Sequence, residues 1–145
     1  PRSRGTVRLA SPDAQAAPLI DPGFLSHPDD LQTLLRAYRA TAALLRTQAL
    51  APHAGRPLHP EPALGDDAAI ERFMRERADT IYHPVGTCRM GSDDDAVLDP
   101  QLRVRGVRGL HVIDASVMPT LVGGNTNAPT LMIAEKAADL LRRAP

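Results

Sequence analysis

The chain has few aromatic residues, one cysteine and no excess of either charge. Aromatic side chains make up 3% of its 145 residues and tryptophan is absent, so we expect a core of aliphatic side chains and alanine. A single cysteine cannot form an internal disulfide, which removes the class of disulfide-bonded secreted scaffolds. Lys+Arg and Asp+Glu both number 17, so no basic excess indicates nucleic-acid binding.

Long apolar runs are also lacking. Residues 115–134 carry no charge, but their Pro, Gly, Asn and Thr content excludes a transmembrane helix. No signal-peptide pattern is present, so we expect a cytoplasmic protein, or one attached peripherally to a membrane. The length suits one modest domain, and 14 prolines predict long irregular connections between short elements.

The first half of the sequence predicts one short strand and two helices. Alternating residues favour a strand over 5–9, followed by an extended loop over 10–28. Leucines at helical spacing predict a helix that starts at a Ser26 cap and runs to about residue 50. A second, shorter helix is expected after a cap at Asp66 or Asp67.

The second half predicts two strands and a final helix. Residues 102–107 alternate like a half-exposed strand, and residues 110–114 resemble a buried strand that ends on Asp114. The last helix is expected to start at Asn127, as a cap, with Pro129 in its first turn. This mixed order of strands and helices favours an α+β fold with an antiparallel sheet.

His83 is the candidate general base. An isolated histidine is more often a packed or surface residue, but this one follows a tyrosine and precedes a Pro-Val-Gly-Thr turn that would fix its backbone. Histidine side chains titrate near neutral pH, which suits proton transfer. The other histidines lack such a setting: His27, His53 and His59 are expected at the surface, and His111 is expected to be structural.

No metal site is predicted. Cys88 lies five residues after His83, and a nucleophilic Cys–His pair is conceivable, but nothing indicates an activated thiolate, so we favour a buried thiol. No second cysteine or paired histidines complete a zinc site. Asp93, Asp94 and Asp95 lack the further ligands and spacing of a calcium loop, and we expect a solvated turn.

Two polar positions are open to two interpretations each. Asn125 and Asn127 flank Thr126 in a loop that opens a helix; they suit turn and cap chemistry, or an anion site at the helix N-terminus. Asp114 could accept hydrogen bonds from cofactor hydroxyls at a strand end, or could cap the turn that follows it.

Four motifs, in order, resemble the carboxy-terminal part of the glucose–methanol–choline (GMC) family of FAD-dependent alcohol oxidoreductases. They are His-Pro-Val-Gly-Thr-Cys-Arg-Met-Gly from His83, Val-Leu-Asp-Pro with Leu-Arg-Val-Arg-Gly-Val from Val97, His-Val-Ile-Asp-Ala-Ser-Val-Met-Pro from His111, and Gly-Asn-Thr-Asn-Ala-Pro-Thr from Gly124. The stretch Gly5 to Leu25 also resembles the start of that segment.

The resemblance implies a reaction and a set of site residues. His83 would take the hydroxyl proton of a primary alcohol while hydride passes to flavin N5, giving an aldehyde. Asn125 would hydrogen-bond the substrate oxygen, as in choline-oxidising and aliphatic alcohol members. Asp114 and Ala115 match positions near the ribityl and pyrophosphate groups of FAD, and Thr126, Asn127 and Pro129 match positions beside the flavin ring.

The chain departs from the family pattern in one respect, because it contains no Gly-x-Gly-x-x-Gly motif for the ADP half of FAD. We therefore expect residues 1–100 to belong to the substrate domain. Residues 101–145 would return to the FAD-binding domain as its last strand and helix. The expected partner is the amino-terminal FAD-binding portion; without it the chain should be inactive, should not retain FAD, and should expose an apolar patch around 112–134 that invites self-association. The alternative is a non-catalytic, partner-binding module.

Overall fold

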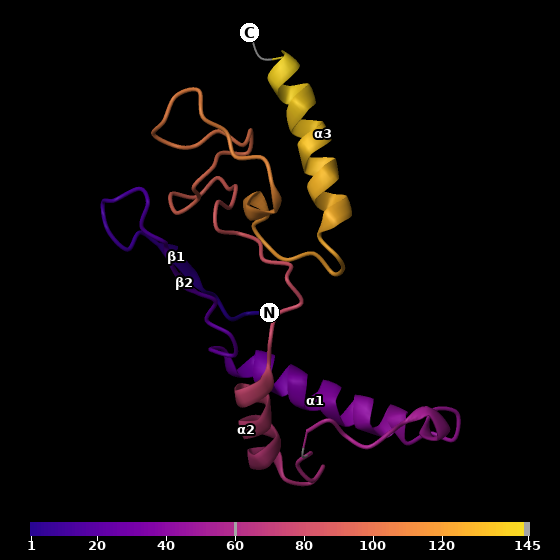
Figure 1. Ribbon diagram of the computed structural model, residues 1–145. Coiled ribbons are helices and arrows are strands. Elements are labelled where there is room, and N and C mark those ends of the chain that lie inside the picture. Colours follow the sequence, from indigo (N-terminus) through magenta and orange to yellow (C-terminus); the bar gives the residue numbers. More distant parts are fainter. Residues whose placement is uncertain (60, 144–145) are drawn as a thin grey trace. The chain divides into compact units, whose positions relative to one another are not determined.

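The computed structural model describes residues 1–59 and 61–143, and the chain divides into two compact units after Asp79. Within the described residues, three α-helices and one two-stranded antiparallel sheet agree with an α+β fold (Figure 1). None of the described helices is long and apolar enough to cross a membrane. The expected domain boundary after residue 100 differs from this division, and the assignment of each part to a domain of a longer enzyme stays a prediction.

The first unit, residues 1–79, begins with a hairpin. Strand β1 (Thr6–Arg8) pairs with β2 (Leu19–Asp21), with Val7 opposite Ile20. The first strand was predicted, whereas β2 lies in the stretch expected to be a loop. Gly5 allows the close approach of the two strands, because a Cβ there would lie 2.2 Å from the Asp21 carbonyl oxygen.

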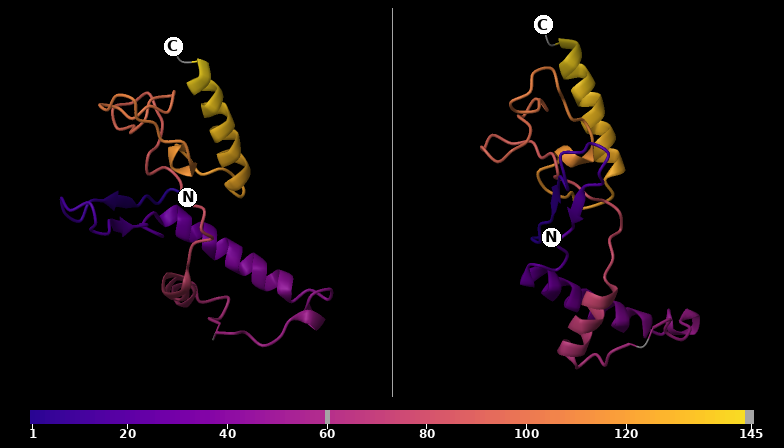
Figure 2. Two further views of the ribbon diagram at one scale, coloured as in Figure 1. Left: turned by 45° about the horizontal axis from the view of Figure 1, so that its top comes forward. Right: turned by 60° about the vertical axis from the view of Figure 1, so that its left-hand side comes forward.

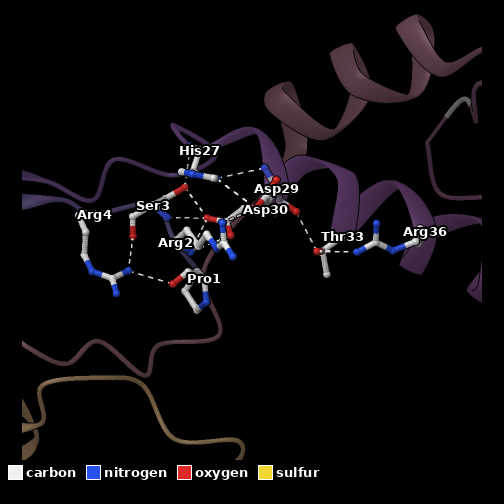
Figure 3. Close-up of polar contacts among 9 residues, drawn as sticks. All are labelled: Pro1, Arg2, Ser3, Arg4, His27, Asp29, Asp30, Thr33 and Arg36. Carbon is white, nitrogen blue, oxygen red and sulfur yellow. Dashed lines mark hydrogen bonds and ion pairs between the residues drawn. The ribbon is translucent and has the colours of Figure 1, made fainter.

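Helix α1 (Pro28–Leu45) follows the hairpin and is capped by His27, not by the predicted Ser26. His27 Nδ1 accepts from the Asp29 N–H at 3.2 Å, so this histidine caps the helix, and its side chain is 38% exposed. The Asp30 carboxylate ties the start of the chain to this end of α1, accepting from the N–H groups of Arg2 and Ser3 at 2.7–3.0 Å (Figure 3).

Helix α2 (Asp67–Arg77) starts after a cap at Asp66, as predicted, and packs on α1 (Figure 2). The core of the first unit consists of Leu31, Leu35, Ile70 and Met74. Helix α1 ends five residues before the predicted end, and Ala51–His53 forms a short 3₁₀ turn. Helix α1 buries an apolar face near its start, and its side chains are largely exposed toward its end.

In the second unit, residues 80–145, isolated backbone hydrogen bonds hold the chain before the last helix in place of a regular sheet. In its described part, neither 102–107 nor 110–114 forms a strand; instead single bridges join Leu98 to Val104 and Arg103 to His111. Leu102 has a positive φ of 64°, which breaks the extended geometry a strand requires. These two predictions were wrong.

The core of the second unit gathers under helix α3 (Asn127–Arg143). Leu98, Leu102, Val117 and Ala137 are its buried members, and Ile133 packs against them. Figure 1 shows α3 running alongside the irregular orange segment that supplies the other core residues, and both views of Figure 2 agree. Asn127 is the first residue of the helix rather than its cap, and Leu141 near the other end is 44% exposed.

Candidate active site

His83 is held from both ring nitrogens by residues of the second unit that lie more than forty positions away in the sequence. Its Nδ1 lies 2.9 Å from Thr126 Oγ1, and its Nε2 lies 3.0 Å from Asn125 Nδ2. The imidazole is half-buried, Thr126 is buried at 8% exposure, and Asn125 is exposed. One edge of the ring is therefore anchored in the protein and the other faces an accessible polar group.

The backbone around His83 is constrained on both sides. Tyr82 adopts a left-handed φ of 62°, which is uncommon for a residue with a side chain. Pro84 restricts the preceding residue to extended conformations, so His83 itself has little backbone freedom. Gly86 has a φ of 89° and turns the chain beside Met118, as expected for the turn that was predicted to fix the histidine.

The loop that carries His83 is fastened to the 3₁₀ turn Ala115–Val117. The Cys88 N–H donates to the Ser116 carbonyl at 3.1 Å, and the Met90 N–H donates to the Val117 carbonyl at 2.9 Å. Cys88 is a free cysteine that packs against the core of the second unit, and it is half-buried rather than buried as predicted. These bonds position the base relative to the turn that follows Asp114.

Asp114 caps this turn. Its Oδ1 accepts from the Ser116 N–H at 2.8 Å and from the Ser116 hydroxyl. The side chain is exposed, so its carboxylate is accessible as well as being a cap. Of the two interpretations, the turn cap is the contact that the structure contains. Ala115, the first residue of the turn, is half-buried.

Thr126 immediately precedes α3 and joins the base to the helix. Its carbonyl oxygen accepts from the Thr130 N–H at 3.0 Å and from the Thr130 hydroxyl at 2.6 Å. The family resemblance predicts Thr126 beside the flavin, and the structure adds that its hydroxyl contacts His83. Thr130 was missed altogether, although a threonine four residues after a loop threonine is a recognisable signal for a helix start.

Three of the seven predicted site residues thus come together by direct hydrogen bonds: His83, Asn125 and Thr126. Asn127 and Pro129 follow Thr126 in the first turn of α3. The hydrogen bonds of the Asp114 side chain stay within its own turn. The cofactor and catalytic roles of all seven stay predictions.

The aspartates at 93–95 form a turn, as expected. Asp93 pairs with Arg89 through two bonds of 2.9 and 2.6 Å, and the hydrogen bonds from this guanidinium hold the pKa of Asp93 well below its usual range. Across the residues that the structure describes, no group of three or more His, Cys, Asp or Glu side chains could hold a metal ion.

Comparison with known proteins identifies the family. The sequence profile of GMC oxidoreductases, in its carboxy-terminal part, matches residues 1–134. An alcohol dehydrogenase (acceptor) from Pseudomonas putida is 50% identical over 143 residues, which cover 99% of this chain and 26% of that protein. Human mitochondrial choline dehydrogenase is 46% identical over 145 residues, covering 99% of this chain and 24% of that protein.

Solved structures agree with the sequence comparison. A pyridoxine 4-oxidase from Mesorbium loti superposes with a TM-score of 0.91 and 36% identity, over 100% of this chain and 28% of that chain. A formate oxidase from Aspergillus oryzae, whose structure concerns FAD modification, superposes with a TM-score of 0.90 and 28% identity, over 96% and 24% of the two chains.

The chain belongs to the GMC oxidoreductase family, to the carboxy-terminal region of these enzymes. It spans about a quarter of the length of the curated relatives that it matches.

Proposed function

We propose that this chain is the carboxy-terminal part of an FAD-dependent alcohol dehydrogenase or oxidase that converts a primary alcohol to an aldehyde. The observation that carries the proposal is the placement of the His83 imidazole between Thr126 and Asn125, with the Nε2 edge next to an exposed amide. Similarity to an alcohol dehydrogenase and to choline dehydrogenase supports the same class of reaction.

In this proposal His83 is the base and Asn125 orients the substrate. Without substrate, the Asn125 amide N–H occupies Nε2 at 3.0 Å. When the alcohol binds, its hydroxyl takes this place and donates to Nε2, and the displaced Asn125 amide donates to the alcohol oxygen. His83 takes the hydroxyl proton as the carbon–hydrogen bond breaks, and the oxygen forms the carbonyl double bond. When bound, FAD supplies the acceptor for the hydride that leaves the carbinol carbon.

The residues present suit a flavin. Helix α3 has 17 residues, and its first N–H groups lack intrahelical acceptors, so its N-terminus favours an electron-rich or anionic group. This end lies directly after Thr126, in contact with the proposed base. Asn127 and Pro129 in the first turn would lie beside the ring. Asp114 and Ala115 would lie near the ribityl and pyrophosphate groups, where the exposed Asp114 carboxylate would accept from ribityl hydroxyls.

Among alcohols, an aliphatic primary alcohol fits this chain better than choline. A quaternary ammonium group is bound by aromatic rings or carboxylates. Two of the four aromatic side chains, Tyr38 and Phe73, pack on each other in the first unit, with ring centroids 6.1 Å apart. The form Asn-Thr-Asn-Ala-Pro-Thr from Asn125 also resembles the aliphatic alcohol members of the family more than the choline-oxidising ones.

The test uses the natural gene product that contains this chain. Purified protein should carry a flavin, and the flavin should be bleached without oxygen by primary aliphatic alcohols, more slowly by choline. A flavin-free protein that no alcohol affects would refute the proposal and favour the non-catalytic module. Bleaching by choline but by no uncharged aliphatic alcohol would refute the preference for an uncharged aliphatic substrate. A cytoplasmic or membrane-peripheral location is checked by fractionating the same cells.

A further inference from the structure

We propose that Thr126 is a positioning residue whose hydroxyl accepts the Nδ1–H of His83 and so keeps the lone pair of the neutral imidazole at Nε2. The inference rests on the proposed function, because it concerns how the base is kept ready for a substrate hydroxyl. It gives Thr126 a task different from cofactor contact.

The chemistry of the two partners determines the tautomer. The Asn125 atom beside Nε2 is the amide nitrogen, which can only donate, so Nε2 accepts. A neutral imidazole then carries its proton on Nδ1. The atom 2.9 Å from Nδ1 is the Thr126 hydroxyl oxygen, which has lone pairs to receive this hydrogen bond. The Asn125 amide therefore specifies the tautomer, and the Thr126 hydroxyl, which can donate or accept, stabilises this tautomer by accepting from Nδ1–H.

Thr126 is well placed to hold the ring still. Its side chain is buried, and a β-branched side chain has few rotamers. Its carbonyl oxygen accepts two hydrogen bonds from Thr130, in the first turn of α3. The acceptor for the imidazole is thus fixed to a regular helix rather than to a free loop, which is the arrangement that keeps a catalytic group in one geometry.

The backbone alone does not set the ring. The left-handed backbone conformation of Tyr82 and the restriction imposed by Pro84 fix the position of the His83 Cα–Cβ bond. The imidazole can still turn about its χ2 bond, which exchanges the positions of ring nitrogens and carbons. The hydrogen bond to the Thr126 hydroxyl favours the ring orientation that places Nδ1 beside it and the tautomer that carries the proton on Nδ1.

The same contact serves both protonation states. When Nε2 takes up a proton, both ring nitrogens become donors, and Thr126 Oγ1 continues to accept from Nδ1. The ring keeps its place through the proton transfer. This need for an acceptor predicts that serine can replace Thr126, whereas valine, which has the same shape without the hydroxyl, cannot.

The direct test is nitrogen NMR of the natural gene product labelled with ¹⁵N-histidine, with Thr126→Val and Thr126→Ser beside the wild type. The His83 resonances should show the proton on Nδ1 in the wild type and in Thr126→Ser, and a mixture or the Nε2–H form in Thr126→Val. A wild type protonated on Nε2 overturns the inference without any variant and independently of catalysis.

Kinetics provide the second readout. Thr126→Val should lower kcat for flavin reduction by about tenfold or more with a smaller change in KM, and Thr126→Ser should restore most of it. Thr120→Val, at an exposed threonine of the second unit, is the control and should leave the rate unchanged. A Thr126→Ser rate as low as that of Thr126→Val would show that the hydroxyl has no positioning role. If the wild type has the Nδ1–H tautomer but no alcohol reduces its flavin, the proposed function is refuted and the inference about Thr126 is not.

Discussion

At the scale of single residues, the site depends on what surrounds His83 more than on the histidine itself. The chain has five histidines, and only His83 has a side-chain partner at each ring nitrogen among the hydrogen bonds described. His27 shows the contrast, because its Nδ1 accepts from a backbone N–H and caps a helix. The same side chain is thus a cap in one unit and a candidate base in the other.

Asn125 gives the first prediction at this scale. Asn125→Ala removes the donor beside Nε2, so the substrate oxygen loses its second hydrogen bond and the rate of flavin reduction should fall about tenfold. Asn125→His, which restores a donor, should recover part of the rate. The measurement is the alcohol-dependent reduction rate in the natural gene product, and a rate equal to that of the wild type would remove Asn125 from the site.

Sequence reasoning proposed a set of site residues, and it did not predict the contacts between them. His83 and Asn125 stand out because each lies beside turn residues in a motif. His83 and Asn125 lie 42 positions apart in the sequence. The backbone hydrogen bonds that bring them together run from Cys88 and Met90 to the turn at 115–117, and no local sequence pattern encodes these bonds. The contact between the Thr126 hydroxyl and His83 was not predicted for the same reason, since the position of Thr126 is set by the start of α3.

At the scale of elements, helices were predictable and the sheet was not. Helices α1, α2 and α3 owe their apolar faces to neighbours three and four residues apart, so the spacing of the apolar side chains reveals them. The pairing of β1 with β2 joins Thr6 to Asp21 across a connection without a regular pattern. In residues 102–114, alternating side chains predicted strands, but Leu102, Gly106 and Gly109 all have positive φ, which breaks the alternation into turns.

The junction at Asp30 gives a pH-dependent prediction. Hydrogen bonds from the Ser3 side chain, then from the backbone of Arg2 and Ser3, hold the pKa of Asp30 well below its usual range. A depressed folded-state pKa stabilises the fold above the unfolded value of about 3.9, and this contribution is lost as pH falls through the folded value. Asp30→Ala should therefore lower stability at pH 7, with a difference from wild type that shrinks below about pH 4.

This prediction is checked by chemical denaturation of the chain between pH 7 and pH 2. Asp94→Ala, at an exposed aspartate in a surface turn, is the control and should differ little from wild type at any pH. An Asp30→Ala deficit that is constant across the range, or that grows on acidification, would contradict the account of this junction.

The core under α3 gives a stability prediction. Leu98 is fully buried among Leu102, Val117 and Ala137. Leu98→Ala should destabilise the second unit by about 2–5 kcal/mol, and Leu98→Met by less than about 1.5 kcal/mol. Denaturation midpoints measure both, with Val107→Ala, which truncates an exposed side chain, as the control. A small loss for Leu98→Ala would show that this core contributes little.

At the scale of the whole molecule, the second unit leaves much apolar surface uncovered. Leu121, Val122, Leu131 and Met132 are exposed, the last two by 59% and 60%, as expected for residues 112–134. In α3, Leu131 and Met132 lie away from the side that buries Ala137, so the helix is apolar on more than one side. Such a helix is normally covered on both sides, which agrees with a chain that spans a quarter of its relatives.

Self-association follows from this surface. We expect the 145-residue chain by itself to form oligomers, and Leu131→Glu with Met132→Glu to reduce them. Leu58→Glu is a matched control, because Leu58 is 95% exposed but lies outside the second unit. Light scattering after gel filtration gives the mass. A monomeric wild type, or equal effects of the control and the double variant, would contradict this prediction.

The central claim is that His83 is the base of an alcohol oxidation. The most direct measurement is the rate of flavin reduction by an aliphatic primary alcohol, without oxygen, in the natural gene product and its His83→Ala variant. We predict a fall of about 10²–10⁴-fold with the flavin content unchanged, and no change in His53→Ala, an exposed histidine of the first unit. A rate in His83→Ala equal to that of the wild type would contradict the claim.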